Sequence, residues 1–543
     1  MALAVGSAPT LAFTIDSGSS DVTMSLDTTV RYNAIQRLER REKGLYSAAN
    51  DESQRFADKG DLALSRLDIF SEFDLNVRNL VGARISAAAW YDTNFPNKVN
   101  RDKSLPAAQA NFPGGRWPDQ TERYYEGPSG EFMDVFGWAN INIGSTTLNV
   151  KAGRFVWLPG EFLISNGSSF TYGMAPNDGL KTSLSPGASA KETGLPIGQL
   201  GLIWQLTPEL TLMGQYVAEF RASRLDEGGT FFSAADGGNA LHAPFLAAGV
   251  PRRDAREGDR GDVGVGIKWM PDMLKGDAVS FWYRKFDDKN PSWANQVFIN
   301  GGVPEAHAVY AKDIELYGLT YNGGWGAWSI GAEVNYRKNM PLASTGQYSN
   351  LPIPGMSRDL SLYGARGNTW HALLSAVSTL NHNMLFDSGS LVMQLDYMRL
   401  DKVTDNKALF NGDMSDVAGR CENNEVLRGC GTRDALSAAV NFTPTWQQAL
   451  PSVDISMPML FMYGLKGNPA AANAGVLPKE SWQFRIGARL EYLSGAYKHQ
   501  FELTYGTRDG KKGKLPGAAV NSYSGLANFR DRDYINFTYS TAF

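Results

Sequence analysis

Apolar and polar residues alternate with a period of two along most of the chain. Between residues 535 and 543, Ile, Phe, Tyr, Thr and Phe occupy every second position, and Asn, Thr, Ser and Ala lie between them. The segments 328–337 and 482–492 repeat the pattern. Successive side chains of a strand point to opposite faces of a sheet, so this period predicts strands with one apolar and one polar face.

About 18 segments carry this pattern. They are 22–38, 61–78, 80–94, 131–143, 146–155, 197–206, 210–224, 261–270, 276–287, 312–321, 326–338, 370–380, 389–401, 435–443, 454–464, 482–493, 498–507 and 533–543. The connections between them are alternately long and short. That rhythm is typical of an outer-membrane barrel, in which long extracellular loops alternate with tight periplasmic turns.

We therefore expect an all-β fold, a transmembrane antiparallel up-and-down β-barrel of about 16–18 strands in the bacterial outer membrane. Trp and Tyr near the strand ends fit an aromatic girdle, and Phe543 ends an alternating strand, as is typical of bacterial outer-membrane barrels. The alternative is a large soluble β protein such as a propeller or solenoid. No fixed-period repeat supports that alternative, so we expect one barrel domain over 13–543.

Composition narrows the function classes. No run of about 18 apolar residues exists, so the sequence offers no transmembrane helix. A net charge of −4 gives no electrostatic basis for a nucleic-acid partner. The five histidines are scattered, and the chain has no G-x-S-x-G, H-E-x-x-H or P-loop motif. We expect no enzyme and assign no catalytic residue, metal or cofactor, although a triad assembled from distant positions would escape this search.

The N-terminus and the two cysteines indicate export. Residues 1–12 (MALAVGSAPTLA) are apolar, rich in small residues and end in a small-x-Ala site, as expected of a signal-peptide remnant. An ordinary first strand is the alternative. Cys421 and Cys430 flank a polar segment, ENNEVLRG. A zinc site would need two more ligands nearby, so we expect a loop disulfide in an oxidising compartment.

If the apolar faces contact lipid, the polar faces line the lumen. The candidate lumen-lining and constriction residues are Arg66, Asp68, Glu72, Asp74, Arg84, Arg154, Trp157, Glu161, Lys191, Glu192, Glu219, Arg221, Glu333, Arg337, Arg485, Arg489 and Glu491. Both signs of charge are present, which argues against strong anion or cation selectivity. We expect these groups to pair, hydrate the lumen and hold its shape. A barrel of this size is wide enough for an aqueous channel unless loops fill it.

One long connection has the composition of a buried segment. Residues 157–196 mix turn formers with the apolar side chains Phe162, Leu163, Ile164, Phe170, Tyr172 and Met174. We expect this segment to fold inward as a constriction or plug, with a structured external cap as the alternative. Residues 228–238 (GGTFFSAADGG) are a second candidate for the same role.

Motifs along the whole chain carry a family resemblance. They include LDTTVRYNAIQR (26–37), KGDLALSRLDIFSEFDLNV (59–77), GRFVWLPGE (153–161), SPGASAKETGLP (185–196) and DRDYINFTYSTAF (531–543). The chain resembles a Gram-negative outer-membrane β-barrel family classed as a domain of unknown function. Its genes often neighbour those of a periplasmic lipid-carrier-like protein and a resistance-nodulation-division-type inner-membrane pump. The resemblance implies movement of a hydrophobic molecule across the outer membrane, with such a carrier and pump as partners.

Three hypotheses follow. The first is an outer-membrane channel or transport component for hydrophobic small molecules or lipids, embedded in membrane lipid and lipopolysaccharide, whose inward loop sets selectivity. The second is a plugged barrel that acts as a binding or structural partner in a trans-envelope assembly. The third is a general aqueous porin, which would need a strongly charged eyelet that the sequence does not reveal.

Overall fold

The structure is a computed structural model of the 543-residue chain. It describes residues 13–42, 45, 58–95, 112–233, 242, 245–247, 250–255, 257–300, 303–344, 364–415, 421, 430–471, 473–495, 497–514, 521–523 and 525–543. The signal-peptide prediction for 1–12 lies outside these residues.

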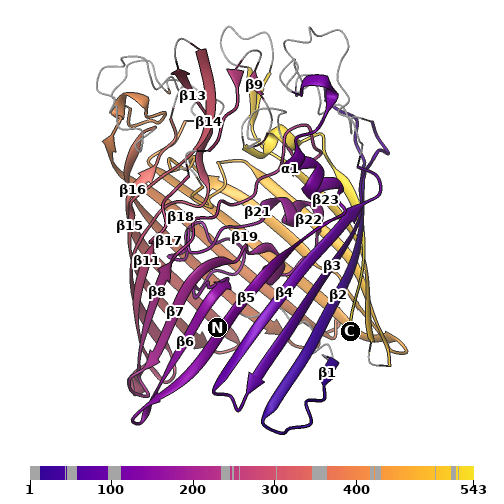
Figure 1. The fold of residues 1–543 in the computed structure, drawn as a ribbon. Coiled ribbons are helices and arrows are strands. Elements are labelled where there is room, and N and C mark those ends of the chain that lie inside the picture. Colours follow the sequence, from indigo (N-terminus) through magenta and orange to yellow (C-terminus); the bar gives the residue numbers. More distant parts are fainter. Residues whose placement is uncertain are drawn as a thin grey trace.

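An 18-strand antiparallel barrel dominates the fold (Figure 1), as the sequence predicts. Its strands are β2 (Val22–Arg37), β3 (Leu62–Val77), β4 (Val81–Asp92), β5 (Ser129–Ile143), β6 (Thr146–Phe155), β7 (Ile197–Gln205), β8 (Leu210–Val217), β11 (Val263–Trp269), β12 (Ala278–Phe286), β15 (Ile314–Trp325), β16 (Trp328–Pro341), β17 (Arg366–Leu380), β18 (Ser388–Asp405), β19 (Asp434–Leu450), the split strand β20 (Val453–Ser456) and β21 (Met459–Lys466), β22 (Trp482–Ser494), β23 (Tyr497–Asp509) and β26 (Tyr534–Ala542).

The barrel closes between its first and last long strands. β2 pairs with β3 along one edge and with β26 along the other. The short strand β1 (Phe13–Ile15) lies on the same edge of β2 as β26, below the point where β26 ends. Phe543 exchanges backbone hydrogen bonds of 2.8 and 3.0 Å with Thr28 at that point. The edge of β2 is therefore covered along most of its length.

Short turns gather at one end of the barrel and long connections at the other (Figure 1). Two predicted boundaries are wrong. The strand expected over 210–224 ends at Val217, after which the chain turns irregularly over the barrel rim. The strand expected over 435–443 is too short, because Pro444 continues β19 and pairs with Gly389, and the strand ends only at Leu450.

Smaller elements lie in the connections. They are η4 (Pro113–Gly115), α1 (Asp119–Thr121), η5 (Glu122–Glu126), α2 (Gly179–Leu184), α3 (Ala190–Thr193), η6 (Asp272–Leu274), η7 (Lys407–Leu409), η8 (Gly525–Phe529), and the paired strands β9 (Phe245–Ala247) and β10 (Val250–Pro251), β13 (Pro291–Asn300) and β14 (Val303–Tyr310), and β24 (Lys512–Lys514) and β25 (Asn521–Tyr523). Among the described residues, no helix is long and apolar enough to span a membrane.

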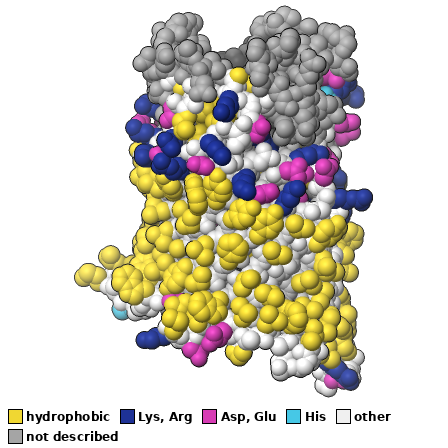
Figure 2. All heavy atoms as spheres, turned by 90° about the vertical axis from the view of Figure 1, so that its left-hand side faces the viewer, with side chains coloured by type: hydrophobic (Ala, Val, Ile, Leu, Met, Phe, Trp, Pro, Cys, Tyr) yellow, Lys and Arg dark blue, Asp and Glu magenta, His cyan; other side chains and the backbone are white. Residues whose placement is uncertain are grey.

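The outer wall carries a broad apolar band (Figure 2). Val265, Phe281 and Leu319 belong to it and are half exposed. Lys, Arg, Asp and Glu side chains gather above the band, beneath the long connections (Figure 2). An apolar belt with charged groups at its upper margin is the surface expected of a barrel in a bilayer.

The upper interior of the barrel holds an apolar core. One cluster joins Phe170, Tyr172 and Met174 to Trp282 and Phe286 of β12, and extends to strands β15–β19 and residues 470–476. A second cluster, near β2 and β3, includes Trp117, Leu180, Phe231 and Phe232. Connections between strands thus fold inward and pack against one another.

Candidate functional site

Residues 157–196, here called the crossing segment, pass through the barrel interior. The segment joins β6 to β7, yet it contacts β16 and β18 on one side and β2 and β3 on the other. A connection that reaches strands so far around the ring has to cross the lumen. Close approach to the wall depends on glycine: a Cβ on Gly331 would lie 2.6 Å from the Cβ of Glu161, and one on Gly318 would lie 2.9 Å from the Cβ of Phe170.

Glu333 anchors the front half of the segment (157–176). This β16 side chain is 1% exposed and points into the interior. Its carboxylate accepts hydrogen bonds from the backbone amides of Glu161, at 2.6 Å, and Phe170, at 2.8 Å. The Ser169 hydroxyl donates to it at 3.1 Å. One inward carboxylate therefore satisfies three donors of a non-repetitive segment, which has no ladder to satisfy its own amides.

Gln394 of β18 holds the next turn of the same half. Its Oε1 accepts from the amides of Leu163, at 2.9 Å, and Ile164, at 2.8 Å. Its Nε2 donates to the carbonyl of Ser165 at 2.8 Å. The Gln394 side chain thus both accepts from and donates to the backbone of the segment, as a neighbouring strand would.

Two buried arginines complete the front anchor. Arg284 donates to the carbonyls of Phe170 and Tyr172, at 2.8 and 2.6 Å. Arg337 donates to the carbonyl of Ser169 at 2.8 Å. Both guanidinium groups come from the barrel wall and serve backbone oxygens, so they are structural contacts to the segment and not free charges in a pore.

The front half covers these polar contacts with aromatic rings. Phe170 stacks on Trp282 with ring centroids 4.8 Å apart. Trp157, at the start of the segment, meets the same Trp282 edge-on at 6.3 Å. Both rings lie in or against the first apolar cluster. Barrel interiors are ordinarily polar, so this apolar patch distinguishes the upper lumen.

Ion pairs hold the rear half (177–196). Glu192 accepts two hydrogen bonds from Arg31 of β2, at 2.8 and 3.0 Å, and both side chains are buried. Burial alone would raise the pKa of Glu192, but the hydrogen bonds and charge of Arg31 outweigh it and lower the pKa to about 2. Glu192 also accepts from the Ser189 amide and closes a capping box on α3.

A second ionic contact joins the rear half to β3. Lys191 donates to Glu72, which also lies 3.5 Å from Arg84. Arg84 in turn makes two hydrogen bonds to Asp74, at 2.7 and 2.8 Å. Lys191 is 51% exposed, so this contact is more open to water than the Arg31–Glu192 pair.

A third contact fixes the start of α2. Asp178 caps the helix by accepting from the Lys181 amide at 2.8 Å, and it also accepts from Arg224 at 2.7 Å. Arg224 makes two further hydrogen bonds to Glu131 of β5. Arg221 contacts Glu131 at 3.3 Å. The rear half is thus tied to β2, β3 and β5 by charge.

The family comparison applies to the whole chain. The model of a protein family of unknown function (DUF1302) matches residues 1–543. The chain belongs to this family. The resemblance seen in the sequence motifs is thereby confirmed.

Solved structures give likenesses of overall shape. Acinetobacter baumannii OccAB4 is 9% identical, with 96% of this chain and 97% of that chain covered and a TM-score of 0.41. Pseudomonas aeruginosa OpdK with vanillate is 10% identical (96% and 98% covered, TM-score 0.40), and a BenF-like porin from Pseudomonas fluorescens Pf-5 is 9% identical (96% and 98% covered, TM-score 0.40). No curated protein matches the chain.

Other predicted lumen residues of this DUF1302 protein lie on the inner wall, where Asp68 is directly opposite Arg31. Arg66 and Asp68 pair with each other at 3.1 Å and are buried. Arg489 donates to Glu502 at 2.7 Å, and Glu491 accepts from Lys498 at 2.7 Å, both toward the end with short turns. Arg485 lies on the same face of β22 as these two residues. The charges of the lower lumen pair along the wall.

The predicted lumen position is wrong for Arg154 and Glu219. Arg154 of β6 lies directly opposite Val135 of β5. Val135 in turn lies opposite Ile85 of β4, which is exposed and faces outward. Arg154 shares its face of β6 with Leu148, so strand alternation turns it outward and not into the lumen. Glu219, beyond the end of β8, accepts from Arg154 at 2.6 and 3.1 Å. Arg221 also follows β8 and belongs to the upper rim.

Several anchoring residues were missed. Arg31, Gln394 and Arg284 all occupy inward positions of alternating strands. The alternation predicts that these side chains point inward. The sequence of each strand does not indicate which connection its inward side chains contact. Asp178 carried a clearer signal, since an Asp directly before the helical GLKTSL is a typical N-cap.

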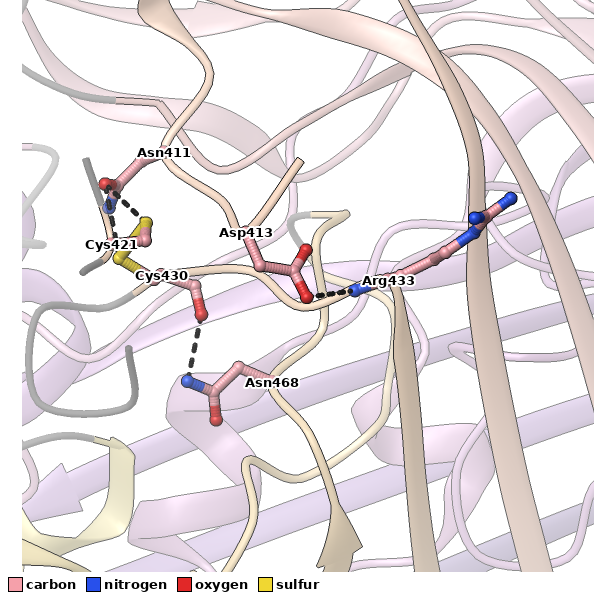
Figure 3. Close-up of a disulfide and its surroundings, with 6 residues drawn as sticks. All are labelled: Asn411, Asp413, Cys421, Cys430, Arg433 and Asn468. Atoms are coloured by element: carbon pink, nitrogen blue, oxygen red, sulfur yellow. Dashed lines mark hydrogen bonds between the residues drawn. A yellow bond between two sulfur atoms is a disulfide. The ribbon is translucent and has the colours of Figure 1, made fainter. Parts of the chain in front are cut away.

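The disulfide prediction is confirmed. Cys421 and Cys430 are bonded in the connection between β18 and β19. Asn411 Oδ1 lies 3.7 and 3.6 Å from the two sulfur atoms, and Asn468 donates to the Cys430 carbonyl at 2.9 Å (Figure 3). The bridge thus lies near Asn468 and the following residues Ala470, Ala471 and Ala474, which belong to the first apolar cluster.

The second candidate segment is described up to residue 233. Phe231 and Phe232 are buried in the second apolar cluster, and Phe232 meets Tyr534 of β26 edge-on at 5.9 Å. Arg532 donates to the carbonyls of Phe231 and Ser233. The remainder of 228–238, including Asp236, lies outside the described residues.

Proposed function

We propose that the protein is an outer-membrane channel for hydrophobic small molecules or lipids, and that the crossing segment determines what passes. The partly exposed Phe162, Leu163 and Ile164 of this segment support the proposal, because an aqueous porin needs polar walls at its constriction. The buried cluster around Phe170 holds the segment in place beside them. The buried charged residues Glu333, Arg284 and Arg337 of the upper lumen are engaged in contacts with the segment. We infer selectivity from apolar contact and shape and assign no enzymatic activity.

The outer band of apolar residues supports a location in the outer membrane. In that setting, a periplasmic carrier protein and an inner-membrane pump would deliver or collect a poorly soluble molecule at the periplasmic end. The runner-up is a plugged barrel that serves as a binding partner in such an assembly. The extensive anchoring of the crossing segment is the observation that favours it.

Replacement of the crossing segment tests the proposal. Phe155 and Ile197 lie directly opposite each other in the β6–β7 ladder, so a short Gly-Ser turn can replace 157–196 without moving either strand. We expect the wild type to show little steady conductance in planar bilayers and to release a hydrophobic dye from phosphatidylcholine vesicles. The replacement should raise conductance strongly and broaden the range of permeating solutes.

A matched control replaces residues 292–309 of the β13–β14 hairpin with a short turn and keeps Pro291 and Tyr310, which lie opposite each other in its ladder. This variant should keep the wild-type conductance. Large steady conductance in the wild type would favour an aqueous porin. An unchanged dye release after removal of the crossing segment would refute its selective role.

A further inference from the structure

The barrel wall has an unpaired strand edge beside β6. β5 begins at Ser129, but its ladder with β6 begins only at Val135, opposite Arg154. The preceding residues pair with β4 alone, and no described strand takes the other edge. Six residues of extended chain correspond to about 20 Å of strand length. The wall is therefore lower along β6–β8 than along β2–β5.

This edge lies at the upper margin of the apolar band. Phe132, in the unpaired part of β5, faces outward and is 68% exposed. Gly130 lies two residues nearer the rim and is opposite Ala89 of β4. Ala89 is opposite Ile69 of β3, which is exposed, so this row of residues also faces outward. Tyr91 lies higher still and is also exposed. Apolar outward residues continue above Phe132, although the charged Arg154–Glu219 pair lies below it. The open edge therefore lies at the upper boundary of the apolar band, next to the lipid headgroups.

A cavity of about 1480 Å³ lies at this edge. Both Glu131 and Phe132 line it. Consecutive strand residues point to opposite faces of a sheet, and Glu131 is bonded to the inward Arg224. A cavity lined by both residues lies along the open edge, where the outer and inner faces of the wall meet. Leu180, in α2 of the crossing segment, forms part of its inner lining.

The lining is amphipathic and balanced in charge. Tyr124, Phe132, Leu180 and Tyr310 supply apolar surface. The lining holds six arginines and six acidic residues. Among them, Arg224 pairs with Glu131, and the outward Arg154 pairs with Glu219 at the lower rim of the opening. A molecule with net charge gains no unmatched partner here, whereas a flat apolar body with one uncharged polar group can use both kinds of lining.

We propose that this opening is a lateral portal, through which a neutral amphiphile passes between the lumen and the outer leaflet of the membrane. This inference rests on the proposed function and adds the route and the substrate class. The crossing segment forms the inner wall of the portal, so its apolar face guides the molecule away from the aqueous axis of the barrel. Phe132 stands at the membrane side of the opening.

Lipid-borne quenching tests the portal. A bimane fluorophore on Ala222→Cys reports from the cavity lining, since the two native cysteines are bonded to each other and do not react. In phosphatidylcholine vesicles containing a cholestane spin label, a neutral amphiphile, we expect strong quenching. The anionic doxyl-stearic acid should quench less, and a water-soluble nitroxide least.

Variants at the mouth give the decisive comparison. Phe132→Lys places a charge at the portal and should remove most of the quenching by the cholestane label, and Phe132→Trp should retain it. Leu319→Lys, at an outward position on β15, is the control and should leave the quenching unchanged. Equal quenching in the two lysine variants, or strongest quenching by the water-soluble nitroxide, would overturn the portal.

Dye release from the same vesicles separates the portal from the proposed function. If Phe132→Lys leaves hydrophobic dye release intact while replacement of the crossing segment changes it, the channel stands and the lateral route fails. If replacement of the crossing segment has no effect on release, the proposed function itself fails, whatever the quenching shows.

Discussion

The two halves of the crossing segment are held by different kinds of interaction. The front half offers its backbone amides and carbonyls to buried wall side chains such as Glu333 and Gln394. The rear half is fixed through ion pairs between side chains, foremost Arg31 and Glu192. The buried contacts of the front half respond little to salt. In the rear half, low pH weakens the Arg31–Glu192 pair, and high ionic strength weakens the exposed Lys191–Glu72 pair. Changes in solution conditions therefore act directly on the rear half.

The largest effect is expected from Glu333→Ala. This substitution leaves the amides of Glu161 and Phe170 and the Ser169 hydroxyl without an acceptor. Each unsatisfied donor should lower the free energy of unfolding by about 1–3 kcal/mol. The unfolding temperature in detergent should fall sharply and the conductance should rise. Glu333→Gln keeps one acceptor oxygen, so its unfolding temperature and conductance should lie between those of the wild type and the Ala variant. If the Ala variant matches the wild type in both assays, the front anchor is misassigned.

Phe170→Ala tests the apolar part of the same half. The ring is fully buried and stacked on Trp282, and its loss should cost about 3–5 kcal/mol. We expect a lower unfolding temperature and a weaker preference for hydrophobic over polar solutes in vesicle release. Phe170→Leu, which retains most of the volume, serves as the control. Unchanged solute preference in the Ala variant would remove the apolar face from the selectivity mechanism.

Acidification should release the rear half. The pKa of Glu192 is about 2 in the folded protein and 4.5 for the unperturbed group, so its stabilisation is complete above pH 4.5 and is lost as pH falls toward 2. The difference corresponds to about 3 kcal/mol. Conductance should therefore rise over that pH interval.

The charge-neutral pair Arg31→Met with Glu192→Gln is the control for this transition. The double variant should lose the pH dependence, and Arg31→Met alone should open the rear half at neutral pH. A pH transition that persists unchanged in the double variant would assign the effect to another group.

The smallest effect is expected from Lys191→Ala. Its contact with Glu72 is partly exposed, and such pairs contribute about 0.2–1 kcal/mol. The change in conductance should be slight at low salt and absent at high salt. An effect as large as that of Arg31→Met would contradict the division between buried and exposed anchors.

The strand pattern could be predicted because it depends on local alternation. All 18 predicted segments correspond to barrel strands. The hairpin of β13 and β14 was missed within the connection expected over 288–311, because its two strands lie above the barrel and do not join the lipid-facing pattern. Charge alone predicts a lumen position for Arg154, whereas the alternation of its own strand turns it outward.

The partners of the crossing segment could not be predicted. Its inward fold was suggested by residues such as Phe170, but Glu333, Gln394 and Arg31 lie far from it in sequence. Their pairing depends on the barrel curvature and on how deep the segment inserts. The portal likewise follows from unequal ladder lengths at β5 and β6, which depend on register rather than composition.

The seam at β2 has a consequence for how the chain folds. The ladder between β2 and β26 joins opposite ends of the chain, so it is the contact with the greatest sequence separation in the barrel. Contacts of this kind make folding slow, and until the ring closes both seam strands present open edges that can pair with other chains. β1 covers the lower part of the β2 edge. It can shield that edge during the delay and also fix the register at which β26 arrives.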